Sequence, residues 1–421
     1  MMRHSNQELH LDLRFRIGRI CRPSDDHDCD YDYENGCMKG KREVDSGSDD
    51  DADDGWLYLL PRRLFRCTVI RTLSIAYCQL KLPAAVNLPF LETLSITGTR
   101  LDGGRSIQRL ISSCPRLVHL TLEAIRRLKR VSVLDKRLRR FALRCCHNVK
   151  SVDIDASELM SLDYCGTVPL ESLMWLHGSR GIPSCTIDFC RAHSKQAEFD
   201  GFRMFMEKFS DTKYMHLHHS RLESRFFLGF PSFTSLTRLA LQGPVRSCGT
   251  VVAVGRVLEQ TPNLEVLSLY MGEYVANKDK EDSEEDEDDG RYEEDEDDGR
   301  YEEDDYGNLA VDEEDEYGNG AMDKAKDAVS HDLWVAPDEF TVPDESSFSM
   351  PCLRHRVKEI NMVHYEGGEA QKMMARLLVC NALVLERLCV VLVRGTFASQ
   401  LKLKNEIESW LVVADPEKIF L

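Results

Sequence analysis

The sequence predicts an α/β fold, a solenoid of irregular repeats whose short parallel strands line a concave face. Three observations support this prediction. One apolar motif recurs along the chain, helical segments followed by proline separate several of its copies, and two acidic segments interrupt the array. With 421 residues, of which 42% are hydrophobic, the chain is long enough to bury a continuous core.

The motif is L-x-x-L-x-L-x-x-N/C-x-L, the template of a leucine-rich repeat. Residues 70–80 fit it at every position, and residues 91–101 fit it with Thr99 in the Asn/Cys slot. Both leucines of L-x-L leave a strand on the same face, because side chains alternate. One unit cannot bury this face alone, so neighbours must stack into an irregular leucine-rich-repeat solenoid. Further copies begin at Leu117, Leu138, Val149, Leu159, Leu236 and Leu264, and a degraded copy contains Met215 and Leu217.

The segments between the copies support the same fold. Apolar residues recur at helical spacing over 107–111 and 254–258, and a proline follows shortly before the next strand in both cases. Proline cannot continue a helix, so it separates helix from strand. The first copies begin 21, 26 and 21 residues apart, but the next begins after only 11. We therefore expect the copies near Val149 and Leu159 to form strand-turn-strand units without helices.

Two acidic segments carry the negative charge of the chain. Residues 279–316 hold 24 acidic and 3 basic residues, a net charge of −21, and residues 25–54 hold 13 and 3, a net charge of −10. Because the whole chain has a net charge of −18, the remainder is basic at +13. Self-repulsion predicts disorder in both segments. The predicted domains are a strand-like segment 1–20, an acidic disordered insertion 21–56, leucine-rich repeats 57–272, an acidic low-complexity disordered loop 273–348, and an α/β domain 349–421 that caps the solenoid.

We predict no catalytic, cofactor or metal site, and therefore a protein that is not an enzyme. The sequence contains no Gly-rich phosphate loop, no G-x-S-x-G and no paired carboxylates on a predicted rigid element. Two clusters resemble metal sites but lack the required spacing or context. They are a calcium-loop-like set without flanking helices, Glu285, Glu287, Asp289, Gly290 and Glu296, and a set in an acidic segment, Cys21, His27, Cys29 and Cys37.

The x positions of the motif face solvent on the predicted concave face, and we expect a protein partner to bind there. The candidate partner-binding residues occupy such positions in the first three copies. They are Arg71, Ser74, Glu92, Ser95, His119 and Thr121. Three histidines on or beside a later strand, His216, His218 and His219, are expected to be ordinary surface residues.

Basic residues crowd the segment 126–144, which contains nine Lys or Arg side chains. This segment is either a nucleic-acid-binding surface or a solvated face. Aromatic residues do not interleave with the basic ones, as stacking on exposed bases requires, so we favour the solvated face.

The 15 cysteines are scattered through apolar stretches and form no CxxC pair. Residues 1–20 carry charge throughout, without the apolar core of a signal peptide. No apolar run approaches the roughly 18 residues that a membrane span needs. We therefore expect no membrane contact, and reduced thiols in the cytoplasm, the nucleus or both.

Three stretches resemble the plant F-box/LRR/FBD proteins. The segment beginning Leu60-Pro61-Arg62-Arg63-Leu64-Phe65 is similar to the one that opens their repeats, and the mid-chain copies are similar to their irregular repeats. The C-terminal part resembles an FBD domain through Pro351-Cys352-Leu353, Asn381-Ala382 and Leu385-Glu386-Arg387-Leu388. The resemblance covers residues 57–272 and 349–397.

The resemblance implies that residues 349–421 form an FBD-like cap. It also implies that the chain is the substrate-recognition part of an SCF-type E3 ubiquitin ligase receptor. Such proteins usually begin with an F-box, a helical segment that docks a Skp-type adaptor. We find no F-box here, so the adaptor is an expected partner only if an F-box lies upstream. The alternatives are a leucine-rich-repeat scaffold outside any ligase, and a nucleic-acid-binding protein that uses residues 126–144.

Overall fold

The computed structural model describes nine stretches of the chain. The acidic segments 21–56 and 273–348 lie outside them, and so do the calcium-loop-like set and the Cys21–Cys37 set. The described residues are 7–13, 58–101, 105–169, 173–179, 181–191, 196–219, 224–272, 350–413 and 416–421.

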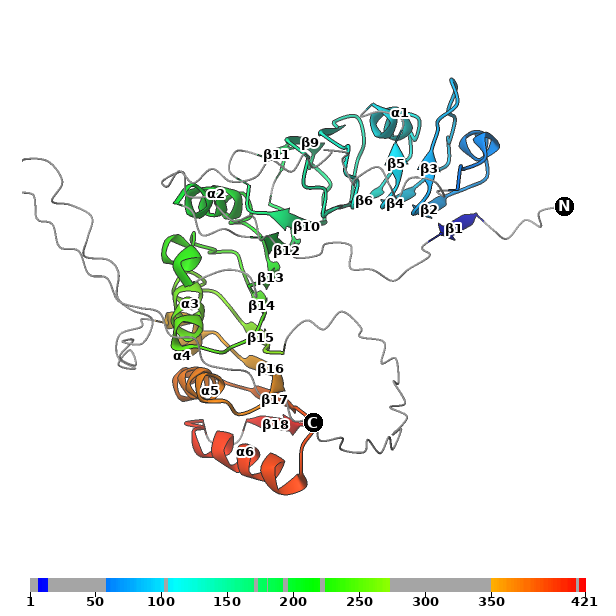
Figure 1. Cartoon of the computed structure of the whole chain (residues 1–421). Coiled ribbons are helices and arrows are strands. Elements are labelled where there is room, and N and C mark those ends of the chain that lie inside the picture. Colours follow the sequence, from blue (N-terminus) through cyan, green and yellow to red (C-terminus); the bar gives the residue numbers. More distant parts are fainter. Residues whose placement is uncertain are drawn as a thin grey trace, which may run out of the picture. The chain divides into compact units, whose positions relative to one another are not determined.

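One parallel sheet of 13 strands organises the described chain (Figure 1). Neighbouring strands pair in register, so Leu73, Leu94 and Leu120 occupy equivalent positions. This long parallel sheet confirms the predicted α/β class. In spatial order the strands are β1 (Glu8–Asp12), β2 (Thr72–Ala76), β4 (Thr93–Thr97), β6 (His119–Glu123), β8 (Arg140–Arg144), β10 (Ser161–Thr167), β12 (Ser184–Arg191), β13 (Tyr214–His218), β14 (Arg238–Gln242), β15 (Val266–Tyr270), β16 (Glu359–Tyr365), β17 (Arg387–Leu392) and β18 (Glu417–Phe420).

The recurring motif builds the core. In β2, Leu73 and Ile75 are buried, whereas Thr72 and Ser74 are half-buried, and β4 and β6 repeat this alternation. Successive side chains leave opposite faces of a strand, so one face of the sheet is apolar and packed, and the other is largely polar. We call the second face, which carries Ser74 and its equivalents in register, the open face.

Helices lie along the apolar side of the sheet. Figure 1 shows α2, α3, α5 and α6 along one side of the strands, and α5 contacts both α3 and α6. Within the described stretches, no helix is both long and apolar enough to cross a membrane. The helices are α1 (Ser106–Ser112), α2 (Gln196–Glu207), α3 (Cys248–Glu259), α4 (Pro351–His355), α5 (Glu369–Asn381) and α6 (Phe397–Ser409), with 3-10 helices η2 (Arg62–Arg66) and η3 (Ser224–Gly229).

A second, three-stranded parallel sheet stands where other repeats have helices. It contains β7 (Arg130–Val133), β9 (Ser151–Asp155) and β11 (Met174–His177). No helix lies between β8 and β10, as predicted, but the copy that begins at Val149 forms β9 in this second sheet and not a strand of the long one. The segment between β8 and β10 is short, and a strand covers a given distance with fewer residues than a helix. A strand advances about 3.3 Å per residue, whereas a helix advances only about 1.5 Å. A separate pair, β3 (Gln79–Leu80) and β5 (Arg100–Leu101), completes the strands.

Several repeat strands end in the same backbone turn. Tyr77, Gly98, Ala124 and Cys145 each follow a strand of the long sheet and have φ between 50° and 54°. Each donates its backbone N–H to a carbonyl near the end of the next strand, at 2.6–3.0 Å. This left-handed conformation costs an L-residue about 1–2 kcal/mol, which the hydrogen bond offsets. At Gly98 an added Cβ would lie 2.8 Å from the Tyr77 ring, so only glycine fits without a shift of that ring.

The C-terminal residues extend the same sheet. Val266 of β15 pairs with Glu359 of β16, and β17 and β18 continue the parallel order. Helix α5 buries Met374, Leu377 and Leu378 in the core. Helix α6 and strand β18 contain no copy of the motif, and the sequence did not predict them.

The two faces of one strand should respond differently to truncation. Leu94→Ala removes a fully buried side chain and should lower the free energy of unfolding by about 2–5 kcal/mol. Ser95→Ala, one residue along on the open face, is the matched control and should change it by less than about 0.5 kcal/mol. Urea unfolding followed by circular dichroism measures both. Equal losses would contradict the assignment of faces.

Candidate functional site

The open face arranges its side chains in rows across the strands. Ser74 pairs with Ser95 and Ser95 with Thr121, so three of the predicted partner-binding residues are direct neighbours. The same row continues through Ala142, Asp163, Thr186 and His216. On β2, β4 and β6 this row offers only small hydroxyl groups, and His10 of β1 precedes them.

The other three predicted residues lie at the start of the same strands. Arg71 and Glu92 precede β2 and β4 and form an ion pair with an N–O distance of 2.7 Å. His119 opens β6, with Nδ1 3.4 Å from the Thr93 hydroxyl oxygen. Burial, followed by the charge of Arg140, lowers the pKa of His119. The structure thus gathers the six candidates on three adjacent strands, and their role in partner binding stays a prediction.

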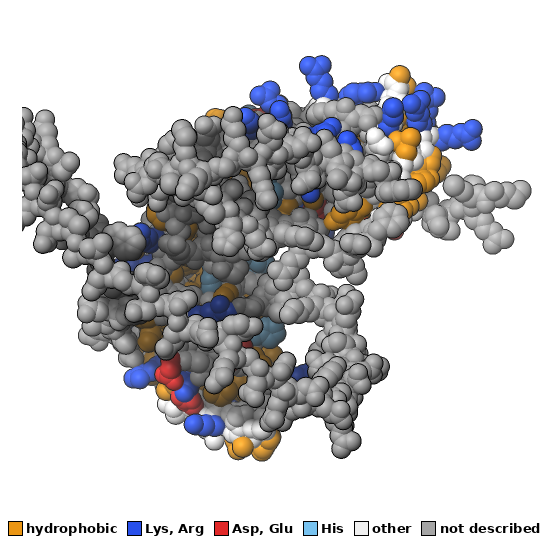
Figure 2. Space-filling view, viewed as in Figure 1, with side chains coloured by type: hydrophobic (Ala, Val, Ile, Leu, Met, Phe, Trp, Pro, Cys, Tyr) orange, Lys and Arg blue, Asp and Glu red, His pale blue; other side chains and the backbone are white. Residues whose placement is uncertain are grey.

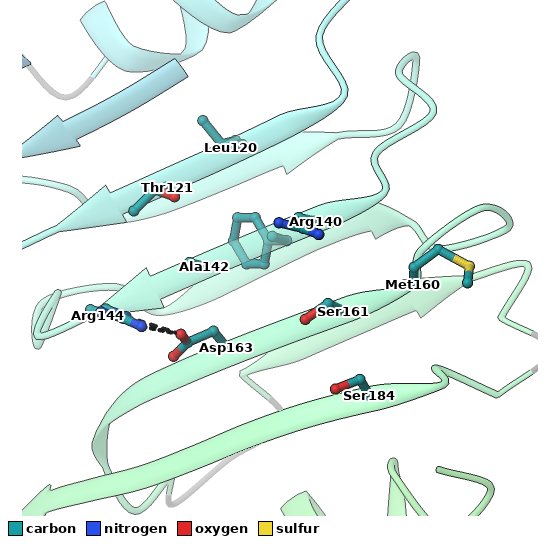
Figure 3. A pocket seen from close by; sticks show the side chains of 10 residues that line it. Leu120, Thr121, Arg140, Ala142, Arg144, Met160, Ser161, Asp163 and Ser184 are labelled. Carbon is teal, nitrogen blue, oxygen red and sulfur yellow. Dashed lines mark hydrogen bonds and ion pairs between the residues drawn. The ribbon is translucent and has the colours of Figure 1, made fainter. Parts of the chain in front are cut away.

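A pocket of about 590 Å³ hollows the open face over β6, β8, β10 and β12 (Figure 3). Among the six candidates, Thr121 lines this pocket. Arg140 and Ser161, paired in register on β8 and β10, lie on its floor, and Ser184 of β12 lies next to them. Sequence reasoning missed this pocket because it is formed by strands from four different repeats.

The two arginines of the pocket differ in their pairing. Arg144 donates hydrogen bonds to the Asp163 carboxylate on the neighbouring strand, and this contact raises the pKa of Arg144 (Figure 3). Arg140 is exposed and forms no ion pair within the part of the chain that the structure describes. The pocket therefore presents Arg140 as a cation that a partner can reach.

Three half-buried polar side chains lie close together on β12 and β13: Asp188, His216 and His218. The rings of His216 and His218 have centroids 4.5 Å apart, and the buried Nε2 of His216 has no hydrogen-bond partner among the described residues. Burial lowers the pKa of His218, and the Asp188 carboxylate opposes that shift. The three histidines expected to be ordinary surface residues are less exposed than that, because His216 and His218 are half-buried and His219 is buried.

The basic segment 126–144 is divided between surfaces. Arg130 lies on β7 of the three-stranded sheet, whereas Arg140 and Arg144 lie on β8 of the long sheet. Figure 2 shows Lys and Arg side chains gathered in the part of the view that holds β2, β3 and α1. Because the segment forms no single stripe, the structure favours the solvated-face interpretation. Three of its nine basic residues pair with acids: Lys136 with Asp135, Arg137 with Glu158, and Arg144 with Asp163.

Comparison with known families identifies the repeats. Residues 50–175 match the family described as FBD-associated F-box protein At5g56370, LRR repeats. Within residues 50–175 the match confirms the predicted leucine-rich repeats, and it confirms the similarity to plant F-box/LRR/FBD proteins. No curated protein matches the chain. The fold and the family match together define a leucine-rich-repeat protein-interaction module.

The buried His219 should make stability depend on pH. Burial lowers the pKa of His219 from 6.5 to about 4, so between these values the unfolded chain binds more protons than the folded one. Stability should therefore fall by about 1–2 kcal/mol as the pH decreases from 6.5 to about 5.

Urea unfolding midpoints measured across this pH range test the expected loss of stability at lower pH. His219→Asn removes this titrating group and should make the profile less steep, but not flat, because burial also lowers the pKa of His216 and His218. A His219→Asn profile as steep as that of the parent would contradict the assignment.

Proposed function

We propose that this protein is the substrate-recognition part of an SCF-type ubiquitin ligase receptor and that it holds a protein partner on the open face. The observation that carries the proposal is the pocket over β6 to β12, which Thr121 and Arg140 both line and in which Arg140 forms no ion pair among the described residues. The similarity of residues 50–175 to the repeats of an F-box protein supports the ligase context. The role is binding and not catalysis.

The chemistry of the pocket indicates the kind of group that it accepts. A guanidinium and nearby hydroxyls such as those of Thr121 and Ser161 are donors suited to a carboxylate or a backbone carbonyl. We propose a partner segment with an acidic side chain opposite Arg140. We place the protein in the cytoplasm or nucleus, which fits the free cysteines of the described stretches.

Charge reversal in the pocket tests the binding surface. Arg140→Glu should weaken capture of the partner, identified by quantitative affinity purification, by at least about tenfold. Arg130→Glu is the matched control, because Arg130 is also exposed but lies on β7, and it should have no effect. If Arg140→Glu is neutral while loss of Ser74, Ser95 and Thr121 abolishes capture, the interface lies on the N-terminal strands instead.

The ligase role needs its own test. An F-box fused to the N-terminus of the full chain should recruit a Skp-type adaptor and promote ubiquitination of the captured partner. The same fusion carrying Arg140→Glu should recruit the adaptor equally well but modify the partner much less. A fusion that binds both adaptor and partner without any ubiquitination of the partner would favour a scaffold outside any ligase.

A further inference from the structure

Three thiols and an imidazole converge at the carboxyl ends of three adjacent strands. Cys145 follows β8, His147 lies in the turn after it, and the other two thiols belong to β10 and β12, which are the next strands in the sheet. We call this group the thiol–imidazole cluster; it consists of Cys145, His147, Cys165 and Cys190.

Local backbone geometry aims these side chains at one another. Cys145 occupies the left-handed turn position and donates its N–H to the Cys165 carbonyl at 2.6 Å. On β12 the register shifts, because Gly166 pairs with Phe189 but Thr167 pairs with Arg191, so Cys190 is the extra residue of a β-bulge. Such β-bulges re-aim side chains and occur next to functional sites.

The ligand atoms of Cys145, His147 and Cys190 lie close enough together to share one metal ion, and the Cys165 sulfur contacts that of Cys145. Zn–S bonds of about 2.3 Å and Zn–N bonds of about 2.0 Å place the ligand atoms of a tetrahedron about 3.5–3.8 Å apart. The sulfurs of Cys145 and Cys165 are 3.6 Å apart, and both ring nitrogens of His147 lie 3.9 Å from the Cys190 sulfur. The ligand atoms of Cys145, His147 and Cys190 all lie within 4.8 Å of one another.

Access from solvent also fits a metal site. His147 is exposed, so an ion can enter from solvent, and His147 and Cys165 line a pocket of about 510 Å³.

We propose that the thiol–imidazole cluster binds one zinc ion. Three thiolates and one imidazole form a closed Cys₃His set, the donor type of structural zinc sites. On binding, each thiol releases its proton to solvent and the imidazole donates the lone pair of one ring nitrogen, with no change of oxidation state. The ion joins the ends of β8, β10 and β12. The proposal departs from the expectation of no metal drawn from the sequence.

Metal content of the full chain tests the proposal. The protein is purified under reducing conditions, incubated with zinc, stripped of loosely held metal on a chelating resin, and assayed by mass spectrometry. His147→Ala and Cys190→Ser should each hold about one equivalent less zinc than the parent, as one lost Cys₃His site requires. Any zinc on the N-terminal cysteines cancels in this difference.

Matched controls separate ligand loss from misfolding. Cys389→Ser removes a half-buried thiol of the same sheet, and His177→Ala removes an exposed imidazole; both should keep the parent's zinc. Zinc should raise the thermal midpoint of the parent but not of His147→Ala. If His147→Ala and Cys190→Ser retain the full zinc content, the proposal is overturned.

Cobalt substitution counts the thiolates. The thiolate-to-cobalt charge-transfer absorption should correspond to three sulfurs and fall by about one third in Cys165→Ser. An unchanged spectrum in that variant would remove Cys165 from the site and overturn the Cys₃His assignment. A Cys145–Cys165 disulfide in the reduced, zinc-loaded protein would also contradict it.

Discussion

In-register pairing of parallel strands fixes the position of nearly every side chain on which this structure depends. A residue on one strand faces its equivalent on the next, so Leu73, Leu94 and Leu120 form one continuous column in the core. A slip of one residue would turn such a column to solvent, because the side-chain period is two. The burial of the leucines and the hydrogen-bond ladder therefore specify the same register.

The same register explains the ion pairs between repeats. Arg71 and Glu92 precede neighbouring strands and lie 2.7 Å apart, and Lys358 and Glu386 repeat this arrangement with an N–O distance of 3.0 Å. Opposite charges at equivalent positions of successive repeats become neighbours in space. Each exposed pair contributes little to stability, because water screens both charges. Like charges at these positions would repel, so the alternation of sign favours the native register.

The sequence predicted elements whose apolar residues follow the motif, and it missed those that replace leucine. Strands β2, β4, β6 and β8 follow from the template, but β12 places Cys185, Ile187 and Phe189 at its buried positions. The pocket and the thiol–imidazole cluster were also missed, because each draws its residues from several repeats. One signal for the cluster was present: Cys145 and Cys165 are 20 residues apart, close to one repeat period.

A parallel sheet of this kind tolerates a long insertion in the sequence between two of its neighbouring strands. Strands β15 and β16 pair over five residues although residues 271–358 separate them in the sequence. The Cys352 thiol donates to the Leu258 carbonyl at 3.2 Å, and Asn361 donates to the Ser268 hydroxyl at the same distance. Loop-closure entropy grows only with the logarithm of length, so a long insertion weakens this junction little. Because the pocket is built on β6 to β12, the length and charge of the insertion can vary without any change in the residues that line it.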